Sequence, residues 1–332
     1  MKALVCREYA PYDKLVVDDV APPALRSGGV RIRVRATGLA FATTLVVEGK
    51  HQNKPDLPFV PGTEIAGEVI ECANDVTGFK PGDRVAAGVR SGGFAEQVVA
   101  ESHAVYPIPD NMDYASATQF PTIYGTAYGG LIWRAGLSAG EVMLVHAAAG
   151  ASGLAALEIG HAMGATVIAT AGGDDKLAVA ADHGADHVIN YRTGGFRDQV
   201  LALTDGRGAD VIFDPVGGDV FDQSLRCIAP EGRILPIGFA GGRIPVAPTN
   251  ILLVKNITVI GLYWGYYLGW GRIAAKRSEM ARVPEAMATM FDWHAQGLLR
   301  PVTHAALDIE DFAQGFEALM SRQVVGKVVL TL

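Results

Sequence analysis

A short segment, residues 142–170, restricts the fold of this chain more than any other part of its sequence. It opens with an apolar, β-branched run at Val142–Ala147, and a turn of small residues at 148–153 follows at once. Leu154–Met163 then has the apolar spacing of a helix, and Thr166–Thr170 is a second apolar run. A strand, a glycine-containing turn, a helix and a strand within about thirty residues predict the first unit of a dinucleotide-binding α/β fold.

The small residues of this turn fit the requirements of a bound pyrophosphate. Gly150, Ala151 and Ser152 lie where the helix begins, and the free N–H groups of a helix N-terminus bind anions. Gly153 is expected to let the helix pack closely on the preceding strand. Ala148 stands where the first glycine of the usual pattern would be, and a glycine turn can also be purely structural. Because both strands and the helix are present, the nucleotide interpretation is favoured.

The end of the second predicted strand indicates which dinucleotide would bind. NAD sites usually place an Asp or Glu there, where it accepts a hydrogen bond from the ribose 2′-OH. This chain has Thr170–Gly173 instead, with Lys176 close behind, which favours the 2′-phosphate of NADP(H). Asp174 and Asp175 oppose this prediction unless they open the next helix, where acidic residues suit the helix dipole. Tyr191, at the end of the third strand, could stack beside the phosphate or be an ordinary half-buried tyrosine.

Size, charge and cysteine content limit the class of protein. The chain has 332 residues, which suggests two domains, and its net charge of −7 without a basic run argues against nucleic-acid binding. Cys6, Cys72 and Cys227 are far apart and offer no disulfide framework, as is usual in a reducing compartment. Met1 leads straight into a strand-like segment without a signal peptide, and no apolar stretch reaches about eighteen residues. We therefore expect a cytoplasmic protein without a membrane span.

The pattern of predicted elements divides the chain into two domains. Residues 1–121 are β-rich, and Val30–Ala36 alternates apolar and charged residues like a strand with one wet face. Residues 122–262 alternate strands and helices, and the six predicted strands are the number in a complete doubly wound sheet. Residues 263–332 are mainly helical and end in a strand at Lys327–Leu332. This strand is expected to return to the first domain, so that 1–121 and 263–332 form one discontinuous catalytic domain.

Several short motifs along the chain match one known group of proteins. In the first part of the chain they are Pro58–Gly62, Gly67–Val69, Gly82–Val85 and Gly92–Glu96. In the middle they are Pro121–Tyr128, His146–Gly150, Asn190–Arg192 and Asp214–Gly218. On these motifs the sequence resembles the medium-chain dehydrogenase/reductase superfamily, and within it the zinc-independent quinone oxidoreductases related to zeta-crystallin. The resemblance implies an α/β fold, with a doubly wound parallel Rossmann sheet and a β-rich, barrel-like (GroES-like) catalytic domain.

The resemblance also implies an activity, a cofactor and contact residues. The quinone oxidoreductases deliver a hydride from C4 of NADPH to a conjugated acceptor, a quinone or an α,β-unsaturated carbonyl. Such acceptors spread the incoming charge over their own π system, so the protein mainly has to position rings and exclude water. A homodimer through the cofactor domains is implied as well. The family's cofactor contacts correspond to Tyr128, Gly150, Ala151, Ser152, Gly172, Gly173, Lys176, Tyr191, Val216, Phe239, Leu262, Tyr263, Trp264 and Lys327.

Zinc chemistry is not expected. In the alcohol dehydrogenases of this superfamily, a Cys and the His of a Gly-His-Glu motif hold catalytic zinc, and the matching positions here are Ala40 and Thr63. Three scattered cysteines cannot supply the cluster of four that a structural zinc lobe needs. Without a Lewis acid an alkoxide has no evident stabiliser, so simple alcohol oxidation is not expected either. Glu64 remains from the motif and is expected to brace its loop by hydrogen bonds.

The substrate side departs from the family pattern. Relatives commonly carry an Asn where Ala40 stands and an aromatic residue where His51 stands, so the preferred acceptor is left open. Phe41 and Thr44 are the candidates for lining the acceptor pocket, and His51 is the candidate proton donor in a nearby loop.

Two further features have both a functional and a structural interpretation. The aromatic window that opens with Tyr263 and Trp264 could form a flat wall for planar acceptors, or it could serve packing. We favour a pocket role for one of these two residues. His146 lies inside the first strand of the dinucleotide unit, and we expect a core histidine with satisfied hydrogen bonds rather than a catalyst.

Two alternative functions are open from the sequence. The same hydride chemistry would serve an enoyl-thioester (2-enoyl-CoA) reductase, for which Arg272, Lys276 and Arg277 are the clustered cations that could hold a CoA or phosphopantetheine. The other is a protein that binds NADPH without useful turnover, because the family Asn is lost at Ala40. The sequence identifies neither the physiological acceptor nor the proton donor, and it does not separate hydride from single-electron transfer.

Overall fold

The computed structural model describes the whole chain except Asn53, Arg272 and Ala274. The chain divides into two compact units, which we describe separately. The β-rich unit comprises residues 1–122, 265–291 and 302–332, and the Rossmann unit comprises residues 123–264 and 292–301. The sequence analysis places 292–301 with the rest of 263–332, and the contacts that put this segment in the Rossmann unit are described below.

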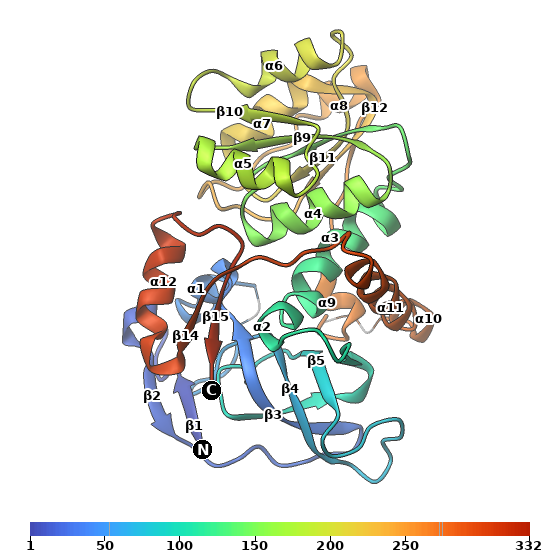
Figure 1. The fold of residues 1–332 in the computed structure, drawn as a ribbon. Helices are drawn as coiled ribbons and strands as arrows, with labels where there is room; N and C mark the ends of the chain where they lie inside the picture. The colour runs from blue at the N-terminus through green and yellow to red at the C-terminus, as the bar shows by residue number, and fades with distance from the viewer. Residues whose placement is uncertain (53, 272, 274) are drawn as a thin grey trace. The chain divides into compact units, whose positions relative to one another are not determined.

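A parallel sheet of six strands forms the centre of the Rossmann unit (Figure 1). Its order is β10-β9-β8-β11-β12-β13, which corresponds to the order 3-2-1-4-5-6 of a doubly wound dinucleotide-binding sheet. The predicted α/β fold class is therefore confirmed for this unit. The strands are β8 (Val142–Val145), β9 (Thr166–Ala171), β10 (His187–Asn190), β11 (Ala209–Asp214), β12 (Ile228–Pro236) and β13 (Thr258–Val259).

Helices connect these strands and supply the apolar layers on the sheet. Leu144, Ile168 and Ile212 of three adjacent strands share one core with Phe196 and Phe221 from the helices. Every residue of β11 is buried, as expected for a central strand of a sheet covered on both faces. The helices are α3 (Gly125–Tyr128), α4 (Ala151–Ala162), α5 (Asp174–Asp182), α6 (Phe196–Leu203), α7 (Gly218–Cys227) and α8 (Thr249–Lys255), with π-helical turns at Phe120–Tyr124 and Gly129–Arg134.

The β-rich unit is built on a seven-stranded sheet. Its order is β14-β15-β3-β4-β5-β7, and β6 also pairs with β3. The last strand of the chain joins this sheet, because β15 runs parallel to β14 and antiparallel to β3. The strands are β3 (Gly29–Gly38), β4 (Glu64–Cys72), β5 (Arg84–Gly88), β6 (Gln97–Glu101), β7 (Val105–Pro107), β14 (Thr303–Asp308) and β15 (Lys327–Thr331), and β1 (Lys2–Val5) pairs separately with β2 (Val16–Asp19).

The alternation predicted for Val30–Ala36 is confirmed in β3. Val30, Ile32 and Val34 point into the core of the β-rich unit, and the arginines between them point outward. On that outer face Arg31 pairs with Glu71 of β4 at 3.1 Å, and Arg35 pairs with Glu68 at 3.2 Å. The period of two thus separates an apolar face from a charged one.

Helix α12 (Phe312–Met320) covers β15 of the β-rich unit (Figure 1). Phe312 and Phe316 pack into the same core as Val328 and Leu330. A Cβ at Gly315 would be 2.5 Å from Leu39 Cδ1 and 3.1 Å from Val328 Cγ1, so a glycine here lets the helix lie close to the sheet without displacing these side chains. The other α-helices with residues in this unit are α1 (Phe41–Val47), α2 (Tyr114–Ala117), α9 (Trp264–Tyr267), α10 (Arg277–Met280) and α11 (Arg282–Ala295).

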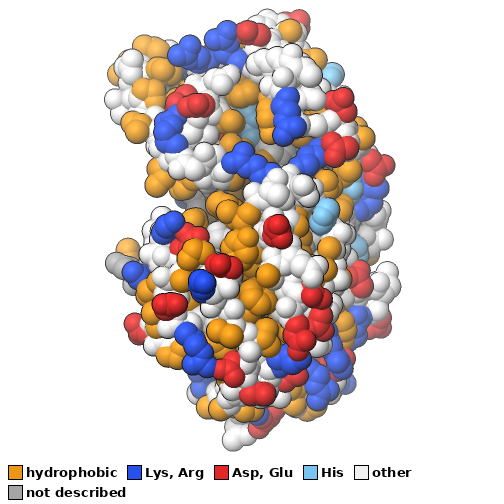
Figure 2. Space-filling model, turned by 90° about the vertical axis from the view of Figure 1, so that its left-hand side faces the viewer, with side chains coloured by type: hydrophobic (Ala, Val, Ile, Leu, Met, Phe, Trp, Pro, Cys, Tyr) orange, Lys and Arg blue, Asp and Glu red, His pale blue; other side chains and the backbone are white. Residues whose placement is uncertain are grey.

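The surface agrees with the charge pattern of the sequence. On the face drawn in Figure 2, Lys and Arg side chains are interspersed with Asp and Glu, and the coloured residues there form no continuous basic band. Among the described residues, no helix is both long and apolar enough to cross a membrane.

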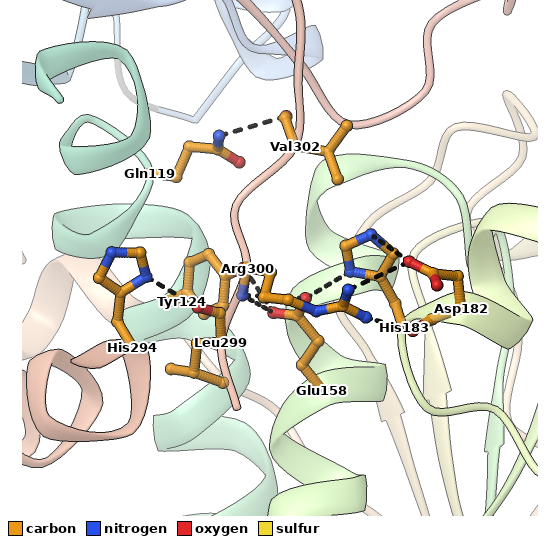
Figure 3. Close-up of polar contacts among 9 residues, drawn as sticks. All are labelled: Gln119, Tyr124, Glu158, Asp182, His183, His294, Leu299, Arg300 and Val302. Atoms are coloured by element: carbon orange, nitrogen blue, oxygen red, sulfur yellow. Dashed lines mark hydrogen bonds and ion pairs between the residues drawn. The ribbon is translucent and has the colours of Figure 1, made fainter. Parts of the chain in front are cut away.

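A buried carboxylate anchors residues 292–301 to the Rossmann unit (Figure 3). Glu158 of α4 is 1% exposed and accepts hydrogen bonds from the Tyr124 hydroxyl at 2.7 Å and from His183 Nδ1 at 2.5 Å. The backbone N–H of Arg300 also donates to it, at 3.1 Å, and the Arg300 guanidinium pairs with Asp182 at 3.1 Å. These contacts explain why residues 292–301 belong with the Rossmann unit. The division expected from the sequence had grouped them with residues 302–332.

Candidate cofactor site

The turn between β8 and α4 leaves a helix N-terminus open to an anion. Gly150 is the N-cap of α4 and offers no side chain to the first N–H groups of the helix. Ala147 turns the backbone with a positive φ of 49°. A Cβ at Gly153 would collide with the backbone of Ala147 and Ala148, so the predicted close packing of helix on strand is confirmed. Ala151 and Ser152 are partly exposed, and their N–H groups are suited to bind a phosphate group.

The tip of β9 has the character of a site for a second phosphate. Gly172 lies under Tyr191 and Arg192: a Cβ on Gly172 would be 2.6 Å from the Tyr191 hydroxyl and 3.1 Å from Arg192 Nε. Gly173 follows as the N-cap of α5, and Lys176 lies in the first turn of that helix. Tyr191 is 50% exposed, which leaves its ring accessible.

The acidic residues beside this tip have structural roles that suit the prediction. Asp174 accepts a hydrogen bond of 2.7 Å from the Asn190 side chain, and Asp174 and Asp175 both lie in the first turn of α5. They therefore open a helix, as the alternative interpretation proposed.

Arg192 is the residue that the sequence analysis did not select. It appeared there only within the motif Asn190–Arg192, because its position over Gly172 depends on the parallel pairing of β10 with β9. Within the part of the chain that the structure describes, no carboxylate forms an ion pair with the Arg192 guanidinium. A loop with glycine N–H groups, a tyrosine hydroxyl and an unpaired guanidinium is suited to a dianionic ligand.

The loops after β11 and β12 carry the other predicted contacts. Asp214, at the end of β11, is fully buried and accepts hydrogen bonds from the N–H groups of Val216 at 2.8 Å and Gly217 at 3.0 Å. Burial raises the pKa of Asp214. The Gly241 N–H donates to the Val216 carbonyl at 2.8 Å, and Phe239 between them is 36% exposed. Two neighbouring loops of the Rossmann unit are thereby held together beside Val216.

The aromatic residues divide between packing and exposure. Trp264 is 5% exposed, lies against Gly125 and Gly129, and its ring centroid is 5.5 Å from that of Trp133. Tyr128 contacts Trp133 in turn, with ring centroids 5.8 Å apart. This arrangement favours the packing interpretation for Trp264. Tyr263, at 50% exposed, and the partly buried Leu262 precede it in the chain.

The substrate candidates lie on the first helix of the β-rich unit and just after it. Phe41 is the first residue of α1 and is 36% exposed. Thr44 is buried, and its hydroxyl donates to the Phe41 carbonyl at 2.7 Å. His51 lies partly buried beyond the helix, where its backbone N–H donates to the Leu45 carbonyl at 3.0 Å. Phe41 and His51 are thus the two candidates whose side chains reach the surface of the unit.

Lys327 and Glu64 form a buried ion pair in the β-rich unit. They are 3% and 1% exposed, and Lys327 Nζ contacts Glu64 Oε1. Gly38 makes the pair possible, because a Cβ there would collide with both side chains. Burial raises the pKa of Glu64, and Lys327 opposes that shift. Glu64 is therefore held by a cation of the last strand, and the Lys327 ammonium, predicted to contact the cofactor, is engaged by this carboxylate.

The remaining candidates bear on metal and thioester binding. Ala40 and Thr63 occupy the positions of two zinc ligands in the resemblance, and among the described residues no group of three His, Cys, Asp or Glu side chains could hold a metal ion. Of the three cations proposed to hold a CoA, Lys276 and Arg277 are exposed at the start of α10, and Arg272 lies outside the described residues.

Known proteins share both the sequence and the fold of this chain. Residues 26–110 match the alcohol dehydrogenase GroES-like domain family, and residues 151–281 match the zinc-binding dehydrogenase family. Quinone oxidoreductase-like protein 2 of Rattus norvegicus is 40% identical over 332 residues, which span all of this chain and 92% of the relative.

Solved structures agree with this relationship. The quinone oxidoreductase of Thermus thermophilus, solved alone and with NADPH, superposes with a TM-score of 0.85 at 33% identity over the full length of both chains. The Escherichia coli quinone oxidoreductase, solved with NADPH, gives a TM-score of 0.89 at 25% identity, again over both full chains. The chain belongs to the quinone oxidoreductase-like family of medium-chain dehydrogenases/reductases. The resemblance and the fold of both units are therefore confirmed.

Proposed function

We propose that this protein is an NADPH-dependent reductase of quinones or other conjugated carbonyl acceptors, and that it works without zinc. The observation that carries the proposal is the β9 tip, where Tyr191 and Arg192 lie against Gly172 and where the strand itself ends in glycines rather than in the Asp or Glu that usually binds a ribose 2′-OH. Asp175 lies beside Gly173, in the first turn of α5. The NADPH found in related quinone oxidoreductases supports the same cofactor here. Zinc independence is supported by Ala40, whose side chain has no donor atom for a metal.

The residues present fit NADPH. The open N-terminus of α4 at Gly150–Ser152 would bind the pyrophosphate, and the β9 tip with Lys176 and Arg192 would bind the 2′-phosphate. The loops at Val216 and Phe239, with Leu262 and Tyr263, would line the nicotinamide half. When bound, NADPH supplies the hydride that goes to the conjugated acceptor, and a proton from water or an acid such as His51 completes the reduction.

The acceptor class rests on the relatives and on the chemistry of the reaction. Quinones and enones carry the added negative charge on their own oxygen through conjugation, so they need positioning more than a Lewis acid. In the β-rich unit, Phe41 is an exposed aromatic side chain that we propose for this role, and Tyr263 is a separate candidate in the Rossmann unit.

The test is NADPH and NADH oxidation with a benzoquinone, a naphthoquinone, an enone and a crotonyl thioester. We expect turnover with NADPH and a quinone, unchanged by EDTA and with no zinc in the purified protein. Preference for the thioester would favour the enoyl-thioester reductase instead. NADPH binding without oxidation by any acceptor would indicate the non-catalytic alternative.

We further propose that the protein is a homodimer through the Rossmann unit. Strand β13 is at the edge of its sheet, and apolar residues between β12 and β13 are unusually exposed. Their exposed fractions are 66% for Ile244, 75% for Val246, 75% for Leu253 and 73% for Val254. Sedimentation at micromolar concentration is expected to show a dimer, and Leu253→Asp is expected to yield monomers. A monomeric wild-type protein would contradict this proposal.

A further inference from the structure

A buried histidine connects three elements at the edge of the Rossmann sheet where the cofactor is proposed to bind. His146 directly follows β8, is 1% exposed, and uses both ring nitrogens. Nδ1 lies 2.9 Å from the hydroxyl of Thr170 on β9, and Nε2 lies 2.8 Å from the hydroxyl of Ser224 on α7. The expectation of a core histidine with satisfied hydrogen bonds is confirmed, and its partners indicate a more specific role.

The donors and acceptors of the two His146 hydrogen bonds follow from the other partner of Ser224. The Ser224 hydroxyl donates its single proton to the Val220 carbonyl at 2.7 Å, so it must accept from His146 Nε2–H. The neutral ring then has a lone pair on Nδ1, which accepts from the Thr170 hydroxyl. Burial lowers the pKa of His146 to about 3, which keeps the ring neutral, and the Phe196 ring closes one side at a centroid distance of 4.7 Å.

Thr170 connects His146 to the two proposed phosphate sites. It lies two residues before Gly172, and its carbonyl accepts from the Ala148 N–H of the glycine turn at 3.1 Å. The β9 tip is therefore joined to the β8 turn twice, once through backbone atoms and once through His146. The two predicted phosphate sites, one on each side of this junction, are held at a fixed separation.

We propose that His146 is a positioning residue for the adenosine half of the cofactor, acting through Thr170. The inference rests on the proposed binding of NADPH. Loss of the Thr170–His146 bond lets the β9 tip shift relative to the α4 N-terminus, which weakens NADPH binding but leaves the reacting nicotinamide end in place. The effect is therefore on Kd and KM, with kcat at saturating NADPH unchanged.

The decisive variant is Thr170→Val, which removes the hydroxyl at constant shape within a strand. We expect its Kd for NADPH to rise about fivefold to tenfold, as for the loss of one buried hydrogen bond, with kcat within about twofold of wild type. The matched control is Thr204→Val. Thr204 also uses its hydroxyl in the Rossmann unit, bonding Val200 and Gly208 at 2.8 Å each, so the control should lower thermal stability but leave Kd unchanged.

Two replacements of His146 test its two hydrogen bonds separately. The side-chain amide of Asn can occupy the position of Nδ1, which bonds Thr170, and that of Gln can occupy the position of Nε2, which bonds Ser224. His146→Asn is expected to keep NADPH affinity close to wild type, and His146→Gln to match Thr170→Val. The double variant Thr170→Val/His146→Gln should bind NADPH no more weakly than either single variant, because both substitutions remove the same hydrogen bond between Thr170 and His146.

The outcomes distinguish this inference from the proposed function. If wild type binds NADPH and Thr170→Val binds it within about twofold of wild type, the positioning role is wrong and the proposed cofactor stands. An equal loss in Thr204→Val would also overturn the role, because any weakened Rossmann unit would then lose affinity. If wild type does not bind NADPH, both proposals fail. Should the His146 variants not fold, Thr170→Val and its control still decide the question.

Discussion

Replacing Lys327 with Met is expected to lower the free energy of unfolding at pH 7 by about 3–5 kcal/mol, because it leaves a buried carboxylate without its partner. Glu64 and Lys327 are 1% and 3% exposed, so water cannot replace the lost cation without disturbing the core. Methionine fills a volume similar to that of lysine beside Gly38. The loss of unfolding free energy is therefore due to the missing charge rather than to a change in packing.

The loss should depend on pH in a defined direction. Burial already raises the pKa of Glu64 above its ordinary value of 4.5, and the variant lacks the cation that opposes the shift. Between pH 4.5 and the raised pKa, the folded variant holds a proton that the unfolded chain has released. The unfolded state then binds fewer protons, so the stability of the variant falls as pH rises through this window. Compared with wild type, the variant should be least impaired near the ordinary pKa of a glutamate.

Urea unfolding of wild type and Lys327→Met from about pH 4.5 to about pH 8 measures this directly. The double variant Glu64→Gln/Lys327→Met is the control, because it removes both charges, and it should recover much of the lost stability at pH 7. A loss in Lys327→Met that is the same at every pH would show that Glu64 is not the group responsible.

Removing the two cations of the β9 tip is expected to convert the cofactor preference. In Lys176→Ala/Arg192→Ala, the Kd for NADPH should rise about 100-fold or more, while the Kd for NADH changes by less than about threefold. Each charge-assisted hydrogen bond to a phosphate contributes about 1.5–3 kcal/mol, and only NADPH carries the 2′-phosphate. Each single variant should lose less NADPH affinity than the double variant. Lys176→Ala alone should already weaken the binding of NADPH far more than that of NADH.

Fluorescence titration of both cofactors measures these constants, and a salt series tests their electrostatic origin. Arg226→Ala is the matched control, because Arg226 is an exposed cation of the same unit on α7, and it should leave both constants unchanged. An equal loss of NADPH and NADH binding in the double variant would exclude the β9 tip as the 2′-phosphate site.

The sequence predicted what depends on neighbouring residues. The alternation of Val30, Ile32 and Val34 specified a strand with one buried face, because side chains of a strand point to opposite sides in turn. The turn before Gly153 specified a helix packed closely on a strand, because only glycine tolerates that approach. His146 was predicted to be a core residue from its place in an apolar strand. The cytoplasmic location is still a prediction.

The structure was needed wherever the partners are far apart in the chain. Arg192 reaches Gly172 only because β10 pairs with β9, and Lys327 reaches Glu64 only because the last strand pairs with β3. Trp264 is drawn into packing against Gly125 and Gly129, and Glu158 holds Arg300 across a separation of 142 residues. Local patterns thus determined the elements, the dinucleotide fold and the glycine turn. The three-dimensional packing alone decided which charges lie at the proposed cofactor site and which pair with each other, because no local periodicity encodes a partner that arrives from another strand.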